Sequence, residues 1–283
     1  MSDTEGISDG DFRKLTAMIG AECGISIGPS KRSMVETRLR KRARLVGMKS
    51  LAAYCQYVHS PEGRTKEWPE FVDAITTHKT DFFREPAHFE VLVNRLLPDL
   101  AASGAGVRRP LLAWSAACST GEEPYTLAMV LSRYAESMAP QNYRFRIEAT
   151  DISHAVVERA RSAVYSEEAI RPVPEEFRRK YLLRSKDRHR GLVRIRPEIR
   201  AAVECRQLNL MDPTYDFSDP FDVVLCRNVM IYFDRPTQQA VLNRVSRTLR
   251  HGGYLLMGHS ESLNGLDLPL VQTGPTVYRR SDG

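Results

Sequence analysis

The chain shows two hydrophobic patterns, one up to about residue 75 and another beyond residue 110. In the first part, apolar side chains recur at helical spacing, and polar or Gly/Pro-containing breaks separate three stripes. The stripes comprise Phe12, Leu15, Met18 and Ile19; Met34, Val35, Leu39 and Leu45; and Leu51, Tyr54, Tyr57 and Val58. Because this part shows no convincing strand pattern, we predict an all-helical N-terminal domain over residues 1–75.

The second pattern alternates short apolar runs with helical stripes. The runs that predict strands lie at residues 111–114, 145–149, 203–210, 221–226 and 254–257. Residues 238–249 are spaced as a helix, which we expect to end at the C-cap His251-Gly252-Gly253. Alternating strands and helices imply a parallel sheet with right-handed crossovers, so residues 76–283 are predicted to form an α/β domain.

One segment, about residues 172–203, interrupts this alternation. It begins with Arg171-Pro-Val-Pro174, continues as a charged stretch, and then alternates apolar and basic residues from Leu192 to Arg196. Such alternation suggests an exposed strand. We therefore predict a small antiparallel β excursion inserted into the α/β domain, and its use as a simple surface hairpin or as a strand-pairing surface stays open.

Composition narrows the class of protein. The 283 residues have ordinary globular fractions, and no apolar run approaches a membrane span. Five scattered cysteines without a C-x-x-C pair favour reduced thiols and a cytoplasmic location. The seven histidines form no H-x-x-H or H-E-x-x-H pattern, so no metal site is predicted. A net charge of +6 suggests an acidic partner, and charge alone leaves nucleic acid, an anionic membrane face and protein open.

The most informative segment is Trp114-Ser-Ala-Ala-Cys-Ser-Thr-Gly-Glu-Glu-Pro-Tyr125. It is patterned as a buried strand, a small-residue turn and a helix start, which lets a ligand approach the backbone closely. It lacks the G-x-G-x-x-G pattern of dinucleotide-binding folds. Glu122 and Glu123 place negative charge where a pyrophosphate would dock. The pattern therefore favours S-adenosylmethionine, which has a sulfonium, an ammonium and a ribose but no phosphate, over NAD.

Polar residues follow two other predicted strands. Asp151 follows the second strand, where an acidic residue characteristically accepts hydrogen bonds from ribose hydroxyls. An equally weighted alternative is that Asp151 only caps the helix at residues 155–160. Arg227 and Asn228 follow the most apolar strand, at the sheet edge where open α/β folds bind ligands.

Five segments, in order and at compatible spacing, together resemble the bacterial chemotaxis receptor methyltransferases, the CheR family. They lie at residues 78–89, 114–125, 149–153, 209–210 and 226–234. The first, His78-Lys-Thr-Asp-Phe-Phe-Arg-Glu-Pro-Ala-His-Phe89, looks like the family's Phe-Phe-Arg-Glu stretch, which folds back over the cofactor. The likeness covers nearly the whole chain, and it implies a Rossmann-like class I methyltransferase sheet behind the helical domain.

The resemblance implies S-adenosylmethionine-dependent methyl esterification of glutamates on the cytoplasmic domains of methyl-accepting chemotaxis receptors, with S-adenosylhomocysteine as product. It implies Arg84 and Tyr232 as catalytic residues, Glu123 at the methionine ammonium and Asp151 at the ribose. The implied cofactor contacts are His78, Thr80, Arg84, Glu123, Asp151, Asn209, Leu210, Cys226, Arg227 and Asn228. At His78 the chain departs from the small polar residue expected there.

The implied reaction agrees with the residue types present. A sulfonium methyl is already activated, so its transfer needs an in-line nucleophile held at attack distance. A glutamate carboxylate, with a pKa of about 4.3, is ionised at neutral pH and needs no general base. A nearby Arg or Tyr can aim it, although binding it too tightly would quench its nucleophilicity. Arg84 and Tyr232 are the candidates for this orienting role.

A basic run at residues 31–44 carries seven positive charges against one negative charge. Arg38, Lys41 and Arg42 fall near one helix face, and the resemblance implies that this domain docks the acidic methylation region of a receptor. A solvated helix face is the plainer interpretation. Nucleic-acid binding is disfavoured because the run lacks interleaved aromatic residues.

Two alternative functions accompany the leading one. One is a non-catalytic S-adenosylmethionine-binding regulator, and the other, less favoured, is a nucleic-acid methyltransferase. The motif Cys226-Arg-Asn-Val lacks the Asn/Asp-Pro-Pro-aromatic signature associated with amino methylation of bases. In relatives, a β-subdomain at the position of the predicted excursion pairs with a C-terminal receptor peptide, and whether this chain uses such a tether stays open.

Overall fold

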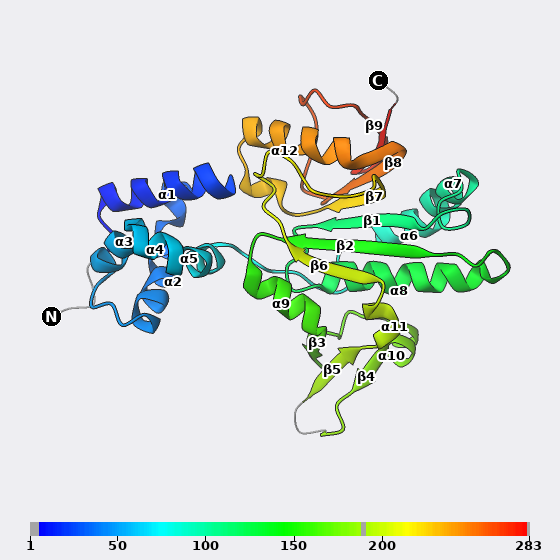
Figure 1. The fold of residues 1–283 in the computed structure, drawn as a ribbon, viewed down its shortest axis with the longest axis horizontal. Helices are drawn as coiled ribbons and strands as arrows, with labels where there is room; N and C mark the ends of the chain where they lie inside the picture. The colour runs from blue at the N-terminus through cyan, green and yellow to red at the C-terminus, as the bar shows by residue number, and fades with distance from the viewer. Residues whose placement is uncertain (1–5, 188–190, 282–283) are drawn as a thin grey trace. The chain divides into compact units, whose positions relative to one another are not determined.

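The computed structural model describes residues 6–187 and 191–281 (Figure 1). The chain forms two compact units. The helical unit comprises Met1–Thr77 and Tyr232–Thr237, and the sheet unit comprises His78–Ile231 and Gln238–Gly283. The return of residues 232–237 to the helical unit has no counterpart in the hydrophobic pattern, because it depends on contacts between distant parts of the chain. None of the described helices combines the length and apolar character needed to cross a membrane.

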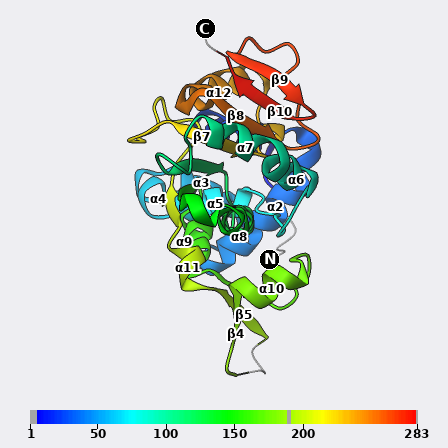
Figure 2. The ribbon, with the colours of Figure 1, turned by 90° about the vertical axis from the view of Figure 1, so that its right-hand side faces the viewer.

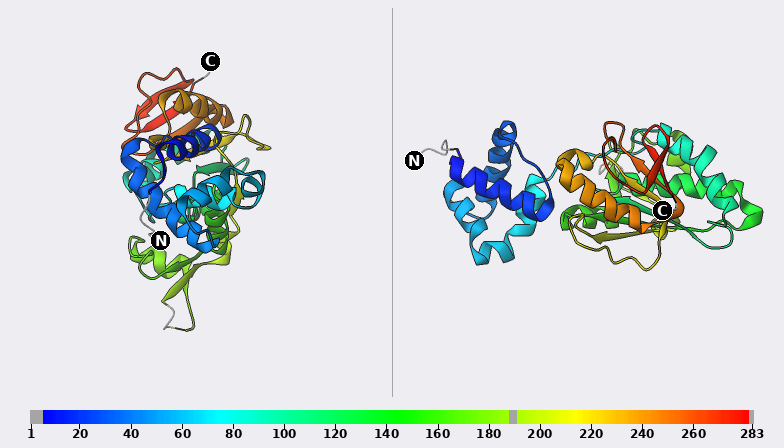
Figure 3. Two further views of the ribbon diagram at one scale, coloured as in Figure 1. Left: turned by 90° about the vertical axis from the view of Figure 1, so that its left-hand side faces the viewer. Right: turned by 90° about the horizontal axis from the view of Figure 1, so that it is seen from above.

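The helical unit is a small bundle of short helices (Figure 3). Its elements are α1 (Asp9–Cys23), η1 (Pro29–Lys31), α2 (Arg32–Leu45), α3 (Leu51–His59), α4 (Pro61–Lys66) and α5 (Trp68–Ile75). Serine side chains at Ser8, Ser50 and Ser60 accept backbone hydrogen bonds at the starts of α1, α3 and α4. Each of the three predicted apolar stripes contributes to its core, in which Leu39 and Tyr54 are fully buried. Leu45 of the second stripe does not, because it is 67% exposed, and Phe71 of α5 is a core residue outside the stripes.

The sheet unit is built on a seven-stranded sheet in the order β6-β2-β1-β7-β8-β10-β9. The strands are β1 (Leu111–Ala116), β2 (Phe145–Asp151), β6 (Val203–Gln207), β7 (Phe221–Cys226), β8 (Leu249–Met257), β9 (Leu270–Gly274) and β10 (Val277–Arg280). The first five are parallel, and β10 runs antiparallel to both β8 and β9. The central strand β7 is buried along its whole length, as its continuous apolar run predicts.

Helices cover the main sheet and complete the α/β fold. They are α6 (Ala87–Val91), a π-helical turn η2 (Leu92–Leu96), α7 (Leu97–Ala102), α8 (Glu122–Ser137), α9 (His154–Ser162) and α12 (Arg235–Thr248). The first turn of α8 tolerates Pro124, and α8 packs on β1, β2 and β6 while α9 packs on β2 and β6. Short 3-10 turns, η3 (Ala139–Gln141) and η5 (Met230–Tyr232), lie in the connections. The predicted fold class is confirmed.

The predicted β excursion is a separate three-stranded antiparallel sheet in the order β3-β5-β4, beside α10 and α11 (Figure 2). Its elements are β3 (Val164–Ser166), α10 (Glu175–Tyr181), β4 (Leu182–Arg184), β5 (Leu192–Ile195) and α11 (Pro197–Arg200). The sheet therefore begins before residue 172, where the excursion was predicted to start. Residues 188–190 of the predicted excursion lie outside the described residues.

The predicted helix C-cap at His251-Gly252-Gly253 is wrong. Helix α12 already ends at Thr248, and these three residues lie inside β8. A Cβ on Gly253 would approach the Arg250 carbonyl oxygen to 2.9 Å and the Phe221 carbonyl oxygen to 3.1 Å. Glycine is needed there because backbone passes close to backbone at a register shift between β7 and β8.

Candidate active site

The turn after β1 combines small residues with strained backbone. Ala117 and Ser119 adopt positive φ values of 59° and 51°, and Gly121 has φ 98°. A Cβ on Gly121 would lie 2.7 Å from the Tyr165 hydroxyl and 3.0 Å from the Ala160 Cβ, so only glycine fits. Strained residues of this kind cluster at ligand sites, and the turn is therefore a candidate ligand cradle.

Asp151, the last residue of β2, is buried and holds this turn. Its Oδ2 accepts the Ser119 N–H at 2.9 Å, and its Oδ1 accepts the Ser153 N–H at 3.0 Å. The N-cap of α9 is Ser153, so the alternative that Asp151 caps this helix is wrong. Burial raises the pKa of Asp151. Each carboxylate oxygen has a further lone pair, and this acceptor capacity fits a ribose hydroxyl.

A buried guanidinium, that of Arg227, joins three segments of the sheet unit. It donates to the Glu123 Oε2 at 2.9 Å, the Glu85 Oε2 at 3.0 Å and the Arg84 carbonyl oxygen at 2.5 Å. The side chain of Arg227 is 1% exposed, and those of the two glutamates are 13% exposed. We call Arg227, Glu85 and Glu123 the Arg227 cluster.

When both carboxylates are ionised, the Arg227 cluster has one more negative charge than positive charge. The second oxygen of Glu123 accepts a hydrogen bond from the Ser115 hydroxyl at 2.7 Å. Burial raises the pKa of Glu123, although the charge of Arg227 acts in the opposite direction. A cationic ligand group at Glu123 would remove the surplus charge, and the ammonium of S-adenosylmethionine fits this requirement.

The segment that carries Arg84 is strained on both sides of this residue. Phe83 and Glu85 adopt positive φ values of 54° and 56°. The Arg84 guanidinium is half-buried and donates to the Lys79 carbonyl oxygen at 3.1 Å, and Thr80 lies half-buried between them in sequence. The ion pair of Glu85 and the bond from Arg227 to the Arg84 carbonyl together fix this conformation.

The loop after β7 holds the next group of predicted residues. Cys226 is buried, and burial raises the pKa of its thiol. Asn228 has a positive φ of 58°, and its side-chain amide donates to the Glu85 Oε1 at 3.2 Å. The carboxylate of Glu261 accepts the Asn228 N–H at 2.8 Å from the other side. The structure therefore brings Glu123, Arg227 and Asn228 together with the backbone of Arg84.

Sequence reasoning missed Glu85 and Glu261. Glu85 follows Arg84 directly in the Phe-Phe-Arg-Glu stretch, and that adjacency was the available signal. Glu261 lies in Gly258-His-Ser-Glu-Ser262, which directly follows the apolar run at the end of β8. A buried glutamate at a strand end could have been suspected from the apolar run that precedes it.

Three further predicted contacts lie at other points of the sheet unit. The His78 carbonyl oxygen accepts a hydrogen bond from the Ser119 hydroxyl at 2.8 Å, which ties residue 78 to the turn after β1. Asn209 follows β6, and its Oδ1 accepts the Met211 N–H at 2.9 Å. Leu210 is buried. The adenine contact predicted for Asn209 and Leu210 stays a prediction.

Glu85, His88 and His259 bring possible metal-ligating atoms within 4.8 Å of one another. The Glu85 carboxylate, however, already accepts hydrogen bonds from the guanidinium of Arg227, the side-chain amide of Asn228 and the backbone N–H of His259. His88 bonds the Thr276 hydroxyl at 2.7 Å, and burial lowers its pKa to about 4. Both oxygens of Glu85 thus already accept hydrogen bonds, and these side chains fit a hydrogen-bonded cluster.

Tyr232, the second predicted catalytic residue, belongs to the helical unit. Its carbonyl oxygen accepts the Ser26 N–H at 2.7 Å, and the Lys31 ammonium lies 5.8 Å from the centroid of its ring. The next residue, Phe233, forms an antiparallel bridge with Ile25. The position of Tyr232 beside the transferring methyl stays a prediction.

The three predicted docking residues of α2 have different environments. The Arg38 guanidinium donates to the carbonyl oxygens of Ile75 at 2.6 Å and Thr76 at 2.8 Å, where α5 ends. Arg42 forms a two-bond ion pair with the buried Glu67, at 2.5 and 3.0 Å. Lys41 is exposed. Arg38 and Arg42 thus stabilise the helical unit itself, and Lys41 is the more accessible member of the set.

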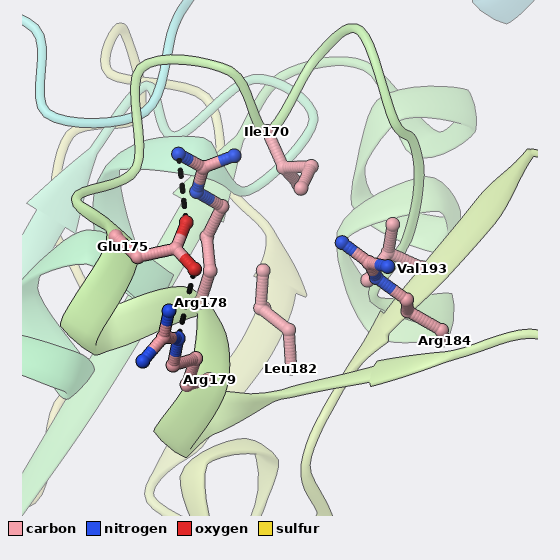
Figure 4. Close-up of a pocket in the computed structure, with 7 residues that line it drawn as sticks. All are labelled: Ile170, Glu175, Arg178, Arg179, Leu182, Arg184 and Val193. Carbon is pink, nitrogen blue, oxygen red and sulfur yellow. Dashed lines mark hydrogen bonds and ion pairs between the residues drawn. The ribbon is translucent and has the colours of Figure 1, made fainter.

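A pocket of about 360 Å³ opens beside the small sheet (Figure 4). It is lined by Ile170, Glu175, Arg178, Arg179, Leu182, Arg184 and Val193. Figure 4 shows the Glu175 carboxylate between two guanidinium groups, Arg178 at 3.3 Å and Arg179 at 2.8 Å. The pocket therefore combines an apolar wall with an excess of positive charge.

Comparisons with known proteins identify the family. Residues 10–76 match the all-alpha domain of CheR methyltransferases, and residues 78–278 match their SAM-binding domain. A chemotaxis protein methyltransferase of Escherichia coli (strain K12) is 38% identical over 99% of this chain and 94% of its own length. A chemotaxis protein methyltransferase of Borreliella burgdorferi is 34% identical over 97% of this chain and 95% of its own length. The chain therefore belongs to the CheR family of S-adenosylmethionine-dependent methyltransferases.

Proposed function

We propose that the protein transfers a methyl group from S-adenosylmethionine to glutamate side-chain carboxylates of chemoreceptor cytoplasmic domains. The product would be a glutamate methyl ester, and the enzyme a protein-glutamate O-methyltransferase. Family membership supports the reaction class, and the Arg227 cluster is the observation in the site that carries the proposal. Its surplus buried negative charge calls for a cationic ligand next to the strained turn after β1.

Two carboxylates would bind two separate polar groups of the cofactor. Glu123 would accept the methionine ammonium with the acceptor capacity that Ser115 and Arg227 leave, and Asp151 would accept the ribose hydroxyls. When bound, S-adenosylmethionine supplies a methyl group that its sulfonium has already activated. The remaining proposed contacts are His78, Thr80, Arg84, Asn209, Leu210, Cys226, Arg227 and Asn228.

Arg84 would orient the acceptor glutamate. Within the described part of the chain, its guanidinium, which has five N–H donors, bonds one acceptor, the Lys79 carbonyl oxygen. Several donors therefore stay available for a carboxylate, and the ionised carboxylate needs no base to remove a proton. Tyr232 would assist by aiming the same group. A site of this kind supplies proximity and orientation, the main requirements of a transfer from an activated methyl donor.

The test is transfer of labelled methyl from S-adenosylmethionine to chemoreceptor cytoplasmic domains. We expect base-labile label on the native receptor and none on a receptor whose methylation-site glutamates are replaced by alanine. Label on nucleic acid would favour the nucleic-acid methyltransferase. Cofactor binding without label on any receptor would favour the non-catalytic regulator.

A matched pair of arginine variants separates catalysis from binding. Arg84→Ala is expected to lower turnover by a larger factor than it weakens cofactor binding. Arg108→Ala is its control, because Arg108 likewise donates to a carbonyl oxygen five residues earlier, that of Ser103 at 3.1 Å. The control should leave turnover unchanged. Equal turnover of both variants would contradict the role proposed for Arg84.

Receptor docking is proposed for the basic face of α2. Lys41→Glu should raise the KM for the receptor several-fold and leave the KM for the cofactor unchanged, and added salt should reduce the difference. Lys66→Glu, an equal charge reversal at an exposed lysine of α4, is the control. Arg38 and Arg42 are less suitable for this test because their replacement would weaken the helical unit.

The pocket beside the small sheet is a second proposed contact with the receptor. Its three arginines and apolar wall suit an acidic peptide with apolar side chains, and β4 lies at the edge of the sheet, where a peptide strand can pair. Arg184→Glu should weaken binding of a receptor's C-terminal peptide and leave methylation of a receptor without that peptide unchanged. Unaltered peptide binding would exclude this pocket as the tether site.

A further inference from the structure

The carboxylate of Glu261 accepts hydrogen bonds from backbone N–H groups of two segments, the loop after β7 and the residue that follows β8. Its Oε2 accepts the N–H of Asn228 at 2.8 Å and that of Gly258 at 2.7 Å. Its Oε1 accepts the N–H of Met230 at 2.8 Å and that of Ile231 at 3.4 Å. The residue is 6% exposed. A buried side chain thus satisfies donors that regular secondary structure satisfies elsewhere.

The loop held by Glu261 could not keep its shape through local preference alone. Asn228 adopts a positive φ of 58°, a conformation that surrounding contacts must impose on a non-glycine residue. A Cβ on Gly258 would lie 2.5 Å from the Asn228 Nδ2 and 2.8 Å from the Glu261 Oε2, so glycine permits the close approach. On its other side the loop meets Glu85, through the side chains of Arg227 and Asn228.

We propose that Glu261 is a positioning residue that sets the conformation of residues 227–231 and thereby the affinity for the cofactor. This inference rests on the proposed cofactor site, which includes Arg227 and Asn228. Glu261 would touch neither the cofactor nor the acceptor glutamate. Its ionised carboxylate would act only through the four backbone donors, two at each oxygen.

Glu261→Gln tests the proposal with almost no change in side-chain volume. The amide retains one oxygen but replaces the other with an NH₂ group, which faces N–H donors and leaves them without an acceptor. We expect the Kd for S-adenosylmethionine and the KM for it to rise about ten-fold or more, which corresponds to about 1.4 kcal/mol. The measurement is calorimetric titration together with steady-state kinetics at a temperature where every variant is folded.

Asp222→Asn is the matched control. Asp222 lies in β7, the strand that precedes the loop held by Glu261, one residue from the start of that strand, and it is 1% exposed. It accepts two bonds from Arg109, at 2.7 and 2.6 Å, and the Leu112 N–H at 2.9 Å. The variant should lower thermal stability and leave the Kd for the cofactor unchanged. An equal rise of Kd in both variants would mean that Glu261 acts only through stability, which overturns the proposal.

A double-mutant cycle with Asn228→Ala adds a result that a purely structural role would not produce. If Glu261 acts through the loop, the change of Kd caused by Glu261→Gln should be smaller in the Asn228→Ala background than in the parent protein. Additive effects would overturn the proposal. Should Glu261→Gln fail to fold, Glu261→Asp keeps the charge but is one methylene too short to reach all four donors. A cofactor affinity equal to wild type for Glu261→Asp would count against the proposal.

Cofactor binding by the parent protein distinguishes a failure of this inference from a failure of the function on which it rests. A parent protein that binds no S-adenosylmethionine or S-adenosylhomocysteine would overturn the proposed function and the inference with it. A parent protein that binds both, combined with a Glu261→Gln variant that binds equally well, would overturn the inference alone.

Discussion

Each of the two units contains an arginine that pairs with a largely buried carboxylate, but the two arrangements differ in charge. In the helical unit, Arg42 pairs with Glu67, which is 3% exposed, and a second contact at 3.4 Å goes to Glu70, whose side chain is 53% exposed. In the sheet unit, the buried Arg227 faces two largely buried carboxylates. The buried charges are therefore balanced in the helical unit and unbalanced in the sheet unit.

The difference indicates which cluster is structural and which is prepared for a ligand. A balanced buried pair with further hydrogen bonds is complete by itself. A surplus buried charge raises the free energy of the empty protein, and a ligand of opposite charge relieves it. Backbone strain accompanies the unbalanced cluster, at Phe83 and Glu85, as it does at many ligand sites.

The largest effect is expected from removal of the buried cations. Arg227→Met leaves two adjacent buried carboxylates without a partner cation, and it should lower the free energy of unfolding by about 3–5 kcal/mol. Arg42→Met leaves one, and its partner keeps the Tyr54 hydroxyl bond, so its cost should be smaller. The measurement is urea denaturation of each variant.

Tryptophan fluorescence can assign the loss of stability to the correct unit. The chain has two tryptophans, Trp68 in the helical unit and Trp114 in the sheet unit. A Trp68→Phe background therefore reports the sheet unit alone. Greater destabilisation by Arg42→Met than by Arg227→Met would contradict the proposed difference between the clusters.

The next effect concerns the surplus charge. Glu123→Gln removes one buried negative charge but keeps an amide that can bond Ser115, so stability should change by less than about 1 kcal/mol. Loss of the charge-assisted bond to an ammonium should weaken cofactor binding by about 1.5–3 kcal/mol, roughly ten- to a hundred-fold. Glu67→Gln should do the opposite, with a loss of stability and an unchanged Kd. Titration calorimetry and denaturation on both variants decide between these patterns.

The surplus charge also predicts two opposite pH dependences. Burial raises the pKa of Glu123 in the empty protein, so its contribution to stability is present at low pH and is lost as pH rises through that raised pKa. Cofactor binding needs the ionised carboxylate and should strengthen over the same pH range. Affinity and the stability contribution of Glu123, measured between pH 5 and pH 8, should therefore move in opposite directions, and Glu123→Gln should flatten both curves relative to the parent protein. A residual slope in stability should remain, because burial also raises the pKa values of Glu122, Asp151 and Glu261. Parallel trends would count against a surplus charge at Glu123.

Much of the fold could be predicted because its signals are local. The strand at residues 221–226 is a continuous apolar run, and it matches β7 (Phe221–Cys226) residue for residue. The prediction failed at Gly252 and Gly253, where two glycines near a helix end resemble a C-cap. The tertiary contact of β8 with β7 decides that conformation, and no local pattern encodes it.

The site could be predicted in part for the same reason. Residues at strand ends, such as Asp151 and Asn228, stand at positions that sequence patterns mark. Glu261 escaped because its role depends on four backbone N–H groups, three of them about thirty residues away in sequence. Arg42 was predicted to dock the receptor because its charge is visible in the sequence. Its partner Glu67 lies at the boundary between α4 and α5, and no local pattern shows that the two side chains meet.

The smallest effect should come from Tyr54, which completes the balanced cluster. Its hydroxyl donates to the Glu67 Oε1 at 2.7 Å, and burial raises its pKa, so the phenol remains a donor at neutral pH. Tyr54→Phe removes this bond without changing the ring, and it should lower the free energy of unfolding by about 1 kcal/mol because Arg42 still pairs with the carboxylate. The Kd for the cofactor should not change. A shift in that Kd would show that the helical unit's buried cluster also serves the ligand, and the division between a structural and a ligand-binding cluster would fail.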